Sequence, residues 1–200
     1  EILDIIHAKN LPISREQALE LLKKYNSDER DIIHYLESEA VLRAIAHYMK
    51  GDEEYYGMLG LLNDLDWGIT KNNPVTHLTK TPEILRQADF DETFIQIILS
   101  HGYGFNCAGL LDKKRTEKIE FALAAGETVT GLIHAYALMR GKKISGMEVK
   151  GLMKKYKDKT FAAGCEREII AEIEYLMPLE TFFEIAIDAI SGIKEEVGLE

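Results

Sequence analysis

The chain has 200 residues, of which 46% are apolar and 29% are charged, and its formal net charge at pH 7 is −10. This length and apolar content predict one domain over residues 1–200 with a substantial core. The negative charge disfavours binding to a nucleic-acid polymer, because a phosphate backbone attracts positive surfaces. We find no apolar run near the roughly 20 residues of a membrane span, and residues 1–4 lack the order of a signal peptide. We therefore expect a cytoplasmic protein with two reduced cysteines and no nucleic-acid or membrane partner.

Helical periodicity predicts the secondary structure along the chain. The segment Ser14–Gln17 has the form of a capping box that opens the first helix, and residues 41–49 carry an apolar stripe at helical spacing. Thr81 is expected to cap a helix that begins with a proline, and Asp91 to cap the next one. Further helices are expected over residues 116–139, 147–156, 166–177 and 180–197. Since no segment alternates with a period of two, the predicted fold class is all-α.

Polar residues stand at the ends or breaks of these apolar helices. His34 begins a core-facing helix, Asn63–Asp64 ends another, His77 lies in a loop, His101 closes an apolar helix and Glu127 interrupts one. One such histidine is more often a hydrogen-bonded core group than a ligand. Five such places suggest that these side chains meet at one site, since imidazoles and carboxylates from several helices can converge on a metal ion. Spacing along the chain alone does not establish that convergence.

Several short segments together resemble the HD-domain superfamily, whose members are all-helical metal-dependent phosphohydrolases. The segments are His34 with Glu39, GLLNDLD at Gly60–Asp66, PVTH at Pro74–His77, SHGYG at Ser100–Gly104 and TGLI at Thr130–Ile133. REQALELLKKYN at Arg15–Asn26 and KKYKDKTFAAGCEREI at Lys154–Ile169 resemble the two ends of a bacterial and archaeal group of predicted HD hydrolases. The resemblance implies an HD-type helical bundle. Residues 14–140 would carry the motif positions, and helices in 141–200 would pack on that core.

The resemblance also implies a set of metal ligands. These are His34, Asn63, Asp64, His77, His101 and Glu127. In the family's pattern Asp64 is the central metal ligand, and His77 and His101 match histidines that some members use for a second metal. Two positions depart from the pattern, because Asn63 stands in place of a histidine and Glu127 in place of an aspartate. An amide oxygen is a weaker ligand than imidazole for most transition metals, and glutamate moves the carboxylate outward by one methylene.

Two interpretations of function remain open from the sequence. In the first, a divalent ion (iron, manganese, nickel, zinc or magnesium) activates a water against a phosphorylated small molecule or nucleotide. Asp64 is then the catalytic residue, because it binds the metal and helps to orient the water. In the second, the two departures leave an inactive or catalytically weak HD protein that acts as a ligand-binding or regulatory module. The sequence leaves the oligomeric state open.

A local block of positive charge lies within residues 140–159, where eight lysines and arginines face two acidic residues. Such a block can attract a phosphorylated ligand, or it can be a solvated helix face. Lys142 or Lys143, just beyond the long predicted helix, and Arg167 are the basic residues expected to hold a substrate phosphate. Arg167 is an equal candidate for a structural salt bridge.

Overall fold

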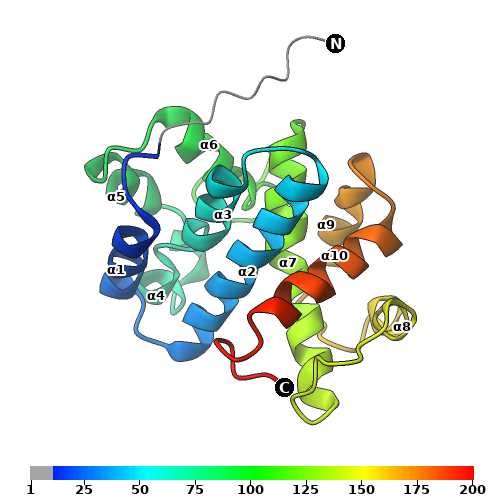
Figure 1. Ribbon diagram of the computed structural model, residues 1–200. Helices are drawn as coiled ribbons and strands as arrows, with labels where there is room; N and C mark the ends of the chain where they lie inside the picture. Colours follow the sequence, from blue (N-terminus) through cyan, green and yellow to red (C-terminus); the bar gives the residue numbers. More distant parts are fainter. Residues whose placement is uncertain (1–10) are drawn as a thin grey trace.

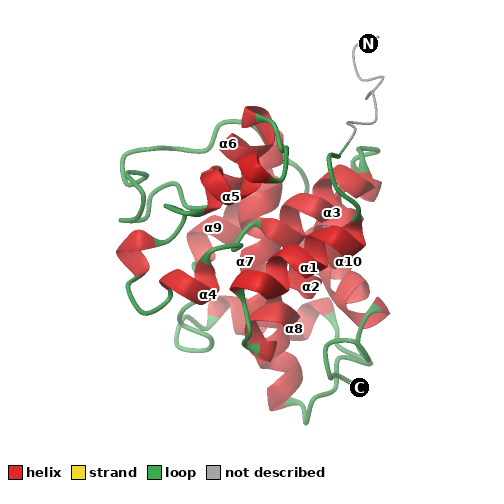
Figure 2. Ribbon diagram, turned by 90° about the vertical axis from the view of Figure 1, so that its left-hand side faces the viewer, coloured by secondary structure: helices red, strands yellow, loops and turns green. Residues whose placement is uncertain are grey.

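The structure, a computed structural model, describes residues 11–200, and this part of the chain folds entirely into helices and loops (Figures 1 and 2). The expectation for the signal-peptide region falls on residues outside this range. The elements are α1 (Arg15–Tyr25), α2 (Glu29–Tyr48), α3 (Glu53–Leu62), α4 (Trp67–Thr70), η1 (Pro74–Thr76), α5 (Thr81–Gln87), α6 (Glu92–Ser100), α7 (Lys118–Met139), α8 (Val149–Lys157), α9 (Arg167–Ala171), η2 (Glu172–Tyr175) and α10 (Leu179–Gly192). The predicted all-α class is confirmed as a single-domain helical bundle.

The centre of the bundle is formed by α2, which packs on α3, α7 and α10 (Figure 1). The predicted stripe of α2 supplies fully buried core residues, including Val41, Leu42 and Ile45. Helix α1 packs on α3 and is itself contacted by α4, and α8 and α9 pack on α7. Burial of this apolar stripe is the main stabilising contribution of α2, at roughly 25 cal/mol per Å² removed from water.

Two of the three predicted helix caps are confirmed. The Ser14 hydroxyl accepts from the Gln17 backbone N–H, and the Gln17 side chain accepts from the Ser14 N–H, which completes the capping box. Asp91 accepts from the backbone N–H of Phe94 at 2.8 Å. The cap assigned to Thr81 is wrong, because Thr81 is already the first helical residue of α5 and its own backbone N–H donates to Asp66. The start of α5 is therefore fixed by a carboxylate from an earlier turn.

Helix α7 corrects the expectation that no segment is suited to a membrane span. Within residues 11–200 it is the one helix whose length and composition would allow a crossing, and 56% of its apolar window is buried inside the protein. It contacts α2, α6, α8 and α9. The apolar character of α7 is accounted for by its place at the centre of the bundle.

Candidate metal centre

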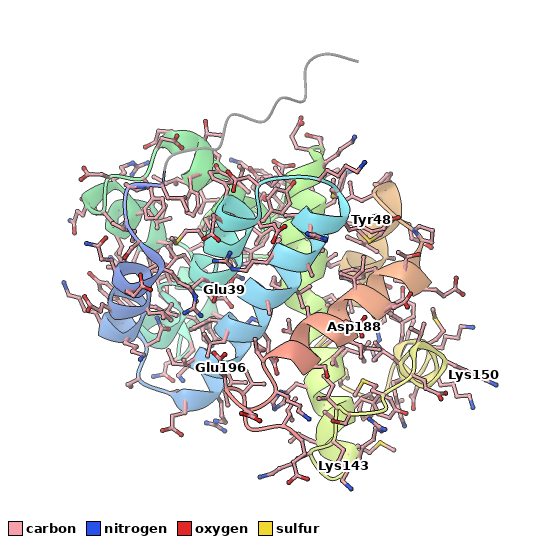
Figure 3. All side chains as sticks on the ribbon, in the orientation of Figure 1. Glu39, Tyr48, Lys143, Lys150, Asp188 and Glu196 are labelled. Atoms are coloured by element: carbon pink, nitrogen blue, oxygen red, sulfur yellow. The ribbon has the colours of Figure 1, made fainter. Side chains whose placement is uncertain are left out.

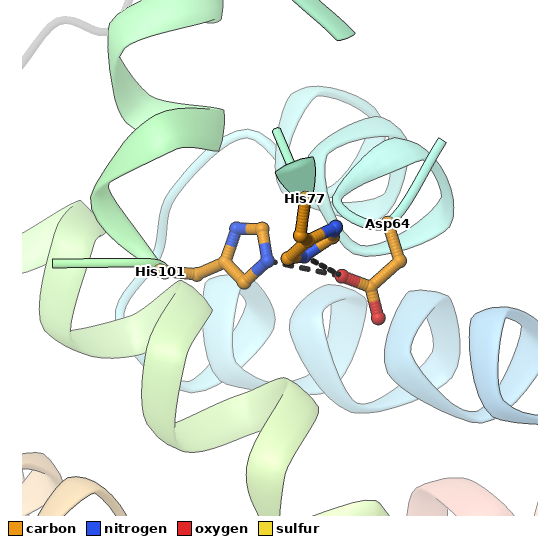
Figure 4. Close-up of side chains that lie close together, drawn as sticks. All are labelled: Asp64, His77 and His101. Atoms are coloured by element: carbon orange, nitrogen blue, oxygen red, sulfur yellow. Dashed lines mark hydrogen bonds and ion pairs between the residues drawn. The ribbon is translucent and has the colours of Figure 1, made fainter. Parts of the chain in front are cut away.

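The turn after α3 presents a carboxylate toward two histidines from later segments. Helix α3 ends at Leu62, and the backbone N–H of Trp67 donates to the Asp64 carbonyl at 2.9 Å, which closes the turn. His77 follows the short helix η1, and His101 is the C-cap of α6. Nε2 of His77 and of His101 lie 3.1 and 3.0 Å from the same oxygen, Asp64 Oδ1 (Figure 4). Three elements far apart in sequence thus meet at one atom.

The other oxygen of Asp64 faces a second group of ligating atoms. Nε2 of His34, on α2, lies 3.4 Å from Asp64 Oδ2 and 3.5 Å from Glu127 Oε2, on α7. Both groups of three residues have the spacing of metal ligands, and Asp64 is common to them. The structure therefore brings together five of the six residues that the resemblance implied.

The far side of each imidazole is bound to an acceptor, which fixes the ring. His77 Nδ1 donates to the Asp66 carboxylate at 3.0 Å, and His101 Nδ1 donates to the Ile98 carbonyl at 2.5 Å. The Thr130 hydroxyl donates to the Glu127 carbonyl, so it accepts from His34 Nδ1 at 2.9 Å. With Nδ1–H engaged in this way, a neutral ring turns its Nε2 lone pair toward carboxylate oxygens. Such lone pairs repel unless a proton or a cation lies between them.

The electrostatics of the cluster follow from this arrangement. Burial by itself would lower the pKa of His34, but Asp64 and Glu127 outweigh it and raise the pKa to about 10. For His77, burial is likewise outweighed by Asp64 and Asp66, which raise its pKa to about 10. Burial would raise the pKa of Asp64, yet its contacts with His101, His34 and His77 hold it well below its usual value. The raised pKa values of His34 and His77 favour a proton between each Nε2 and its carboxylate oxygen, at positions that a cation can take instead.

The surrounding donor set fits a divalent transition metal. Imidazole nitrogen and carboxylate oxygen are the ligands that zinc, iron, manganese and nickel take in proteins. The outer acceptors on all three histidines are the hydrogen bonds that orient metal-ligating imidazoles. The described residues thus offer possible metal ligands, and the identity of the ion stays a prediction.

Asn63 occupies an unusual environment next to Asp64. Its side chain is fully buried, and neither of its polar atoms has a hydrogen-bond partner within residues 11–200. Leaving a buried amide unpaired costs roughly 1–3 kcal/mol. Asn63 lines neither of the two cavities beside the cluster, so its assignment as a metal ligand stays a prediction.

Sequence reasoning missed three residues that position the cluster. Asp66 is fully buried and accepts from His77 and from the backbone N–H groups of Leu78, Lys80 and Thr81. Thr130 orients His34, as described above. Arg115 donates to the carbonyls of Ser100 and Tyr103 around His101 and forms an ion pair with Glu172. The GLLNDLD and TGLI segments contained two of these residues, but only the fold shows what they contact.

The assignment of Arg167 as a phosphate ligand is wrong. This side chain is 7% exposed, and its guanidinium is saturated by backbone acceptors. It donates to the carbonyls of Lys155, Tyr156, Asp158, Phe161, Ala162 and Cys165. Arg167 therefore ties the loop between α8 and α9 together, which is neither of the roles expected from the sequence.

The predicted role of Lys142 and Lys143 as ligands of a substrate phosphate finds no support, because neither residue lines a cavity beside the cluster. Both lie beyond the C-terminal end of α7 at Met139, which is about a dozen residues, or roughly 18 Å along the helix axis, from Glu127. Lys143 lines a separate surface depression with Lys194 and Glu200. Figure 3 shows Lys143 and Lys150 projecting outward at the edge of the molecule. Most lysines of the basic block are exposed, as expected for a solvated face.

Two adjoining cavities open beside the cluster. The larger, of about 420 Å³, is lined by Asp64, His77 and His101 together with Trp67, Pro74 and residues 105–107. The smaller, of about 250 Å³, is lined by His34 and by residues of α7 and of the loop that precedes α9. Glu127 and Phe105 line both cavities. The cluster is therefore accessible to a small molecule from two sides.

Comparisons of this chain with protein-family models, with curated proteins and with solved structures each gave no match. The assignment to the HD superfamily accordingly remains a prediction, based on the motif residues. The geometry described above depends only on this chain.

Proposed function

We propose that the protein is an HD-type, metal-dependent phosphohydrolase that acts on a phosphorylated small molecule or nucleotide. The observation that carries the proposal is the convergence of three oriented histidines on the two oxygens of Asp64. Asp64 would be shared between two metal positions, one completed by His77 and His101 and the other by His34 and Glu127. A divalent ion supplies Lewis acidity and lowers the pKa of a water when it is bound at such a site.

The residues of the chain would hold and orient the reactants. Asp66, Ile98 and Thr130 keep the three Nε2 atoms directed at the cluster through their contacts with Nδ1. Asp64 and Glu127 provide the negative charge that balances a divalent ion. The larger cavity provides space for the substrate beside these ligands. The free thiols Cys107 and Cys165 are in keeping with the cytoplasmic location that we propose.

The decisive experiment compares metal content and hydrolysis in the wild type and in Asp64→Asn. The asparagine keeps the shape of the side chain but removes the shared carboxylate. Asp188→Asn, on the outer face of α10 (Figure 3), is the matched control. We expect wild type and control to bind manganese, iron, nickel, zinc or magnesium and to release phosphate from phosphate esters, and Asp64→Asn to lose both properties.

The other outcomes are equally informative. Hydrolysis that survives in Asp64→Asn would contradict the proposal. Metal binding without any hydrolysis would favour the alternative of a ligand-binding or regulatory HD protein. The supporting observation for this alternative is that the buried Asn63 amide, which stands where the pattern has a histidine, has no hydrogen-bond partner among residues 11–200.

A further inference from the structure

Two aromatic side chains, Trp67 and Phe105, line the larger cavity beside the cluster, and we refer to them as its aromatic wall. Pro74 also lines this cavity, and Asn106 adds a carboxamide. The Phe105 side chain is 42% exposed, so its ring lies at the water boundary. The Trp67 ring packs edge-on against His77, with 5.1 Å between the ring centroids. A cavity of about 420 Å³ with such a wall is of the size that binds small organic molecules.

Both cavities are poor in positive charge. In the part of the chain that the structure describes, neither lining contains a lysine or an arginine, whereas Asp64, Glu127 and Glu166 contribute carboxylates. Arg115, which contacts the loop after His101, is already engaged with Glu172 and with backbone carbonyls. A polyphosphate chain needs arginine or lysine donors beyond the metal ions to offset its charge. The lining therefore suits one phosphate group held at the cluster.

On the basis of the proposed phosphohydrolase function, we infer that the substrate is a monoester of a single phosphate whose organic part contains a flat ring, as in a nucleoside monophosphate. The ring lies against Trp67 and Phe105, and the Asn106 carboxamide, which both donates and accepts, meets its polar edge. In the reaction the water oxygen bonds to phosphorus, the ester P–O bond breaks and the leaving oxygen takes a proton. The products are inorganic phosphate and the free alcohol.

Trp67 makes the inference directly measurable, since it is the only tryptophan of the chain. Adenosine 5′-monophosphate, adenosine 5′-triphosphate and glycerol 3-phosphate are titrated into manganese-loaded protein while tryptophan fluorescence is recorded. We expect the monophosphate to change the fluorescence with a Kd at least about 10-fold below that of glycerol 3-phosphate, the gain typical of base stacking on aromatic rings. Its Kd should also lie below that of the triphosphate, whose additional charge meets no lysine or arginine in the lining. No response to the monophosphate, or equal or tighter binding of either competitor, would overturn the inference.

A pair of variants locates the binding of the ring. Phe105→Ala removes an exposed ring, so the fold is expected to persist, and Tyr48→Ala removes a similarly exposed ring at the end of α2 (Figure 3). We expect Phe105→Ala to raise the Kd of adenosine monophosphate about 10-fold while glycerol 3-phosphate binding stays the same. Tyr48→Ala should change neither. An unchanged Kd in Phe105→Ala would refute the assigned wall.

Hydrolysis assays with the same three compounds separate the two proposals. Selective binding of the monophosphate without turnover of any compound would contradict the phosphohydrolase function and leave the ring site supported. Turnover of glycerol phosphate or of the triphosphate as fast as that of the monophosphate would support the function and overturn the ring inference.

Discussion

Replacing Asp66 with asparagine tests whether the cluster depends on a buried carboxylate that does not face the metal position. In the wild type each oxygen of Asp66 accepts two hydrogen bonds at 2.9–3.0 Å, and Oδ1 also accepts a longer one of 3.4 Å from the Thr70 hydroxyl. An asparagine in either orientation turns its NH₂ group toward at least two of the shorter-range donors, so at least two hydrogen bonds are lost. At roughly 1–2 kcal/mol for each lost bond in a buried, charged setting, the free energy of unfolding should fall by about 2–4 kcal/mol.

The same substitution weakens the hold on His77. Loss of an outer acceptor from a metal-ligating histidine typically costs 10- to 100-fold in metal affinity or activity. We would measure urea unfolding of the metal-free protein and manganese affinity by titration calorimetry. Asp91→Asn is the control, because Asp91 caps α6 by accepting from the Phe94 backbone N–H, and this substitution should cost about 1 kcal/mol or less. Wild-type stability together with wild-type metal affinity in Asp66→Asn would show that Asp66 does not anchor the site.

The remaining predictions concern the protonation of the histidines, the asparagine at position 63 and helix packing. The neighbouring carboxylates outweigh burial, so the pKa values of His34 and His77 rise from 6.5 to about 10 on folding. In metal-free protein the stability that the two histidines contribute is therefore fully present below pH 6.5 and is lost as the pH rises toward 10. The urea midpoints at pH 6, 8 and 10 should fall in that order. Manganese affinity should rise over the same range, since the metal displaces these protons, and calorimetry in buffers of different ionisation enthalpy should detect their release. Asn63→His should raise nickel or manganese affinity, and no gain would count against residue 63 as a ligand position. Gly60→Ala places a methyl group 2.6 Å from a carbonyl oxygen of α2 and should lower the unfolding free energy by about 1–3 kcal/mol, whereas Gly192→Ala meets nothing within 4 Å and should be nearly neutral in the same denaturation assay.

The fold could be predicted from the sequence in those segments whose structure is determined by local patterns. The Ser14 capping box and the stripe of residues 41–49 each specify a structure within one or two helical turns, and both are present. Thr81 was misassigned because the donors at the start of α5 bond to Asp66, 15 residues earlier in the chain. A capping rule based on neighbouring residues does not take into account an acceptor, such as Asp66, that comes from a distant part of the chain. The apolar content of α7 was likewise underestimated, because its single central charge, Glu127, makes the run look interrupted.

The candidate site could be predicted only in part, again because some of its contacts are long-range. The ligand candidates stood out as polar residues at ends of apolar helices, and five of them do converge. The basic residues were chosen by charge and by nearness in sequence. Arg167 has the charge to bind phosphate, but its guanidinium donates to six backbone carbonyls, and the sequence does not reveal these contacts. The residues that hold the histidines, Asp66 and Thr130 above all, act through contacts across 11 and 96 positions of the chain.

The two departures from the family's pattern have different geometric consequences. Glu127 is longer than the aspartate that it replaces, yet its Oε2 lies 3.5 Å from His34 Nε2, so the added methylene does not take the carboxylate out of reach. Asn63 removes a strong donor, but each half of the cluster already offers three possible ligands without residue 63. Three protein ligands with a further position open to water is the arrangement of catalytic metal sites, whereas a fourth strong ligand closes a site. The asparagine is therefore compatible with a working centre, and the gain expected from Asn63→His in metal affinity need not bring a gain in hydrolysis.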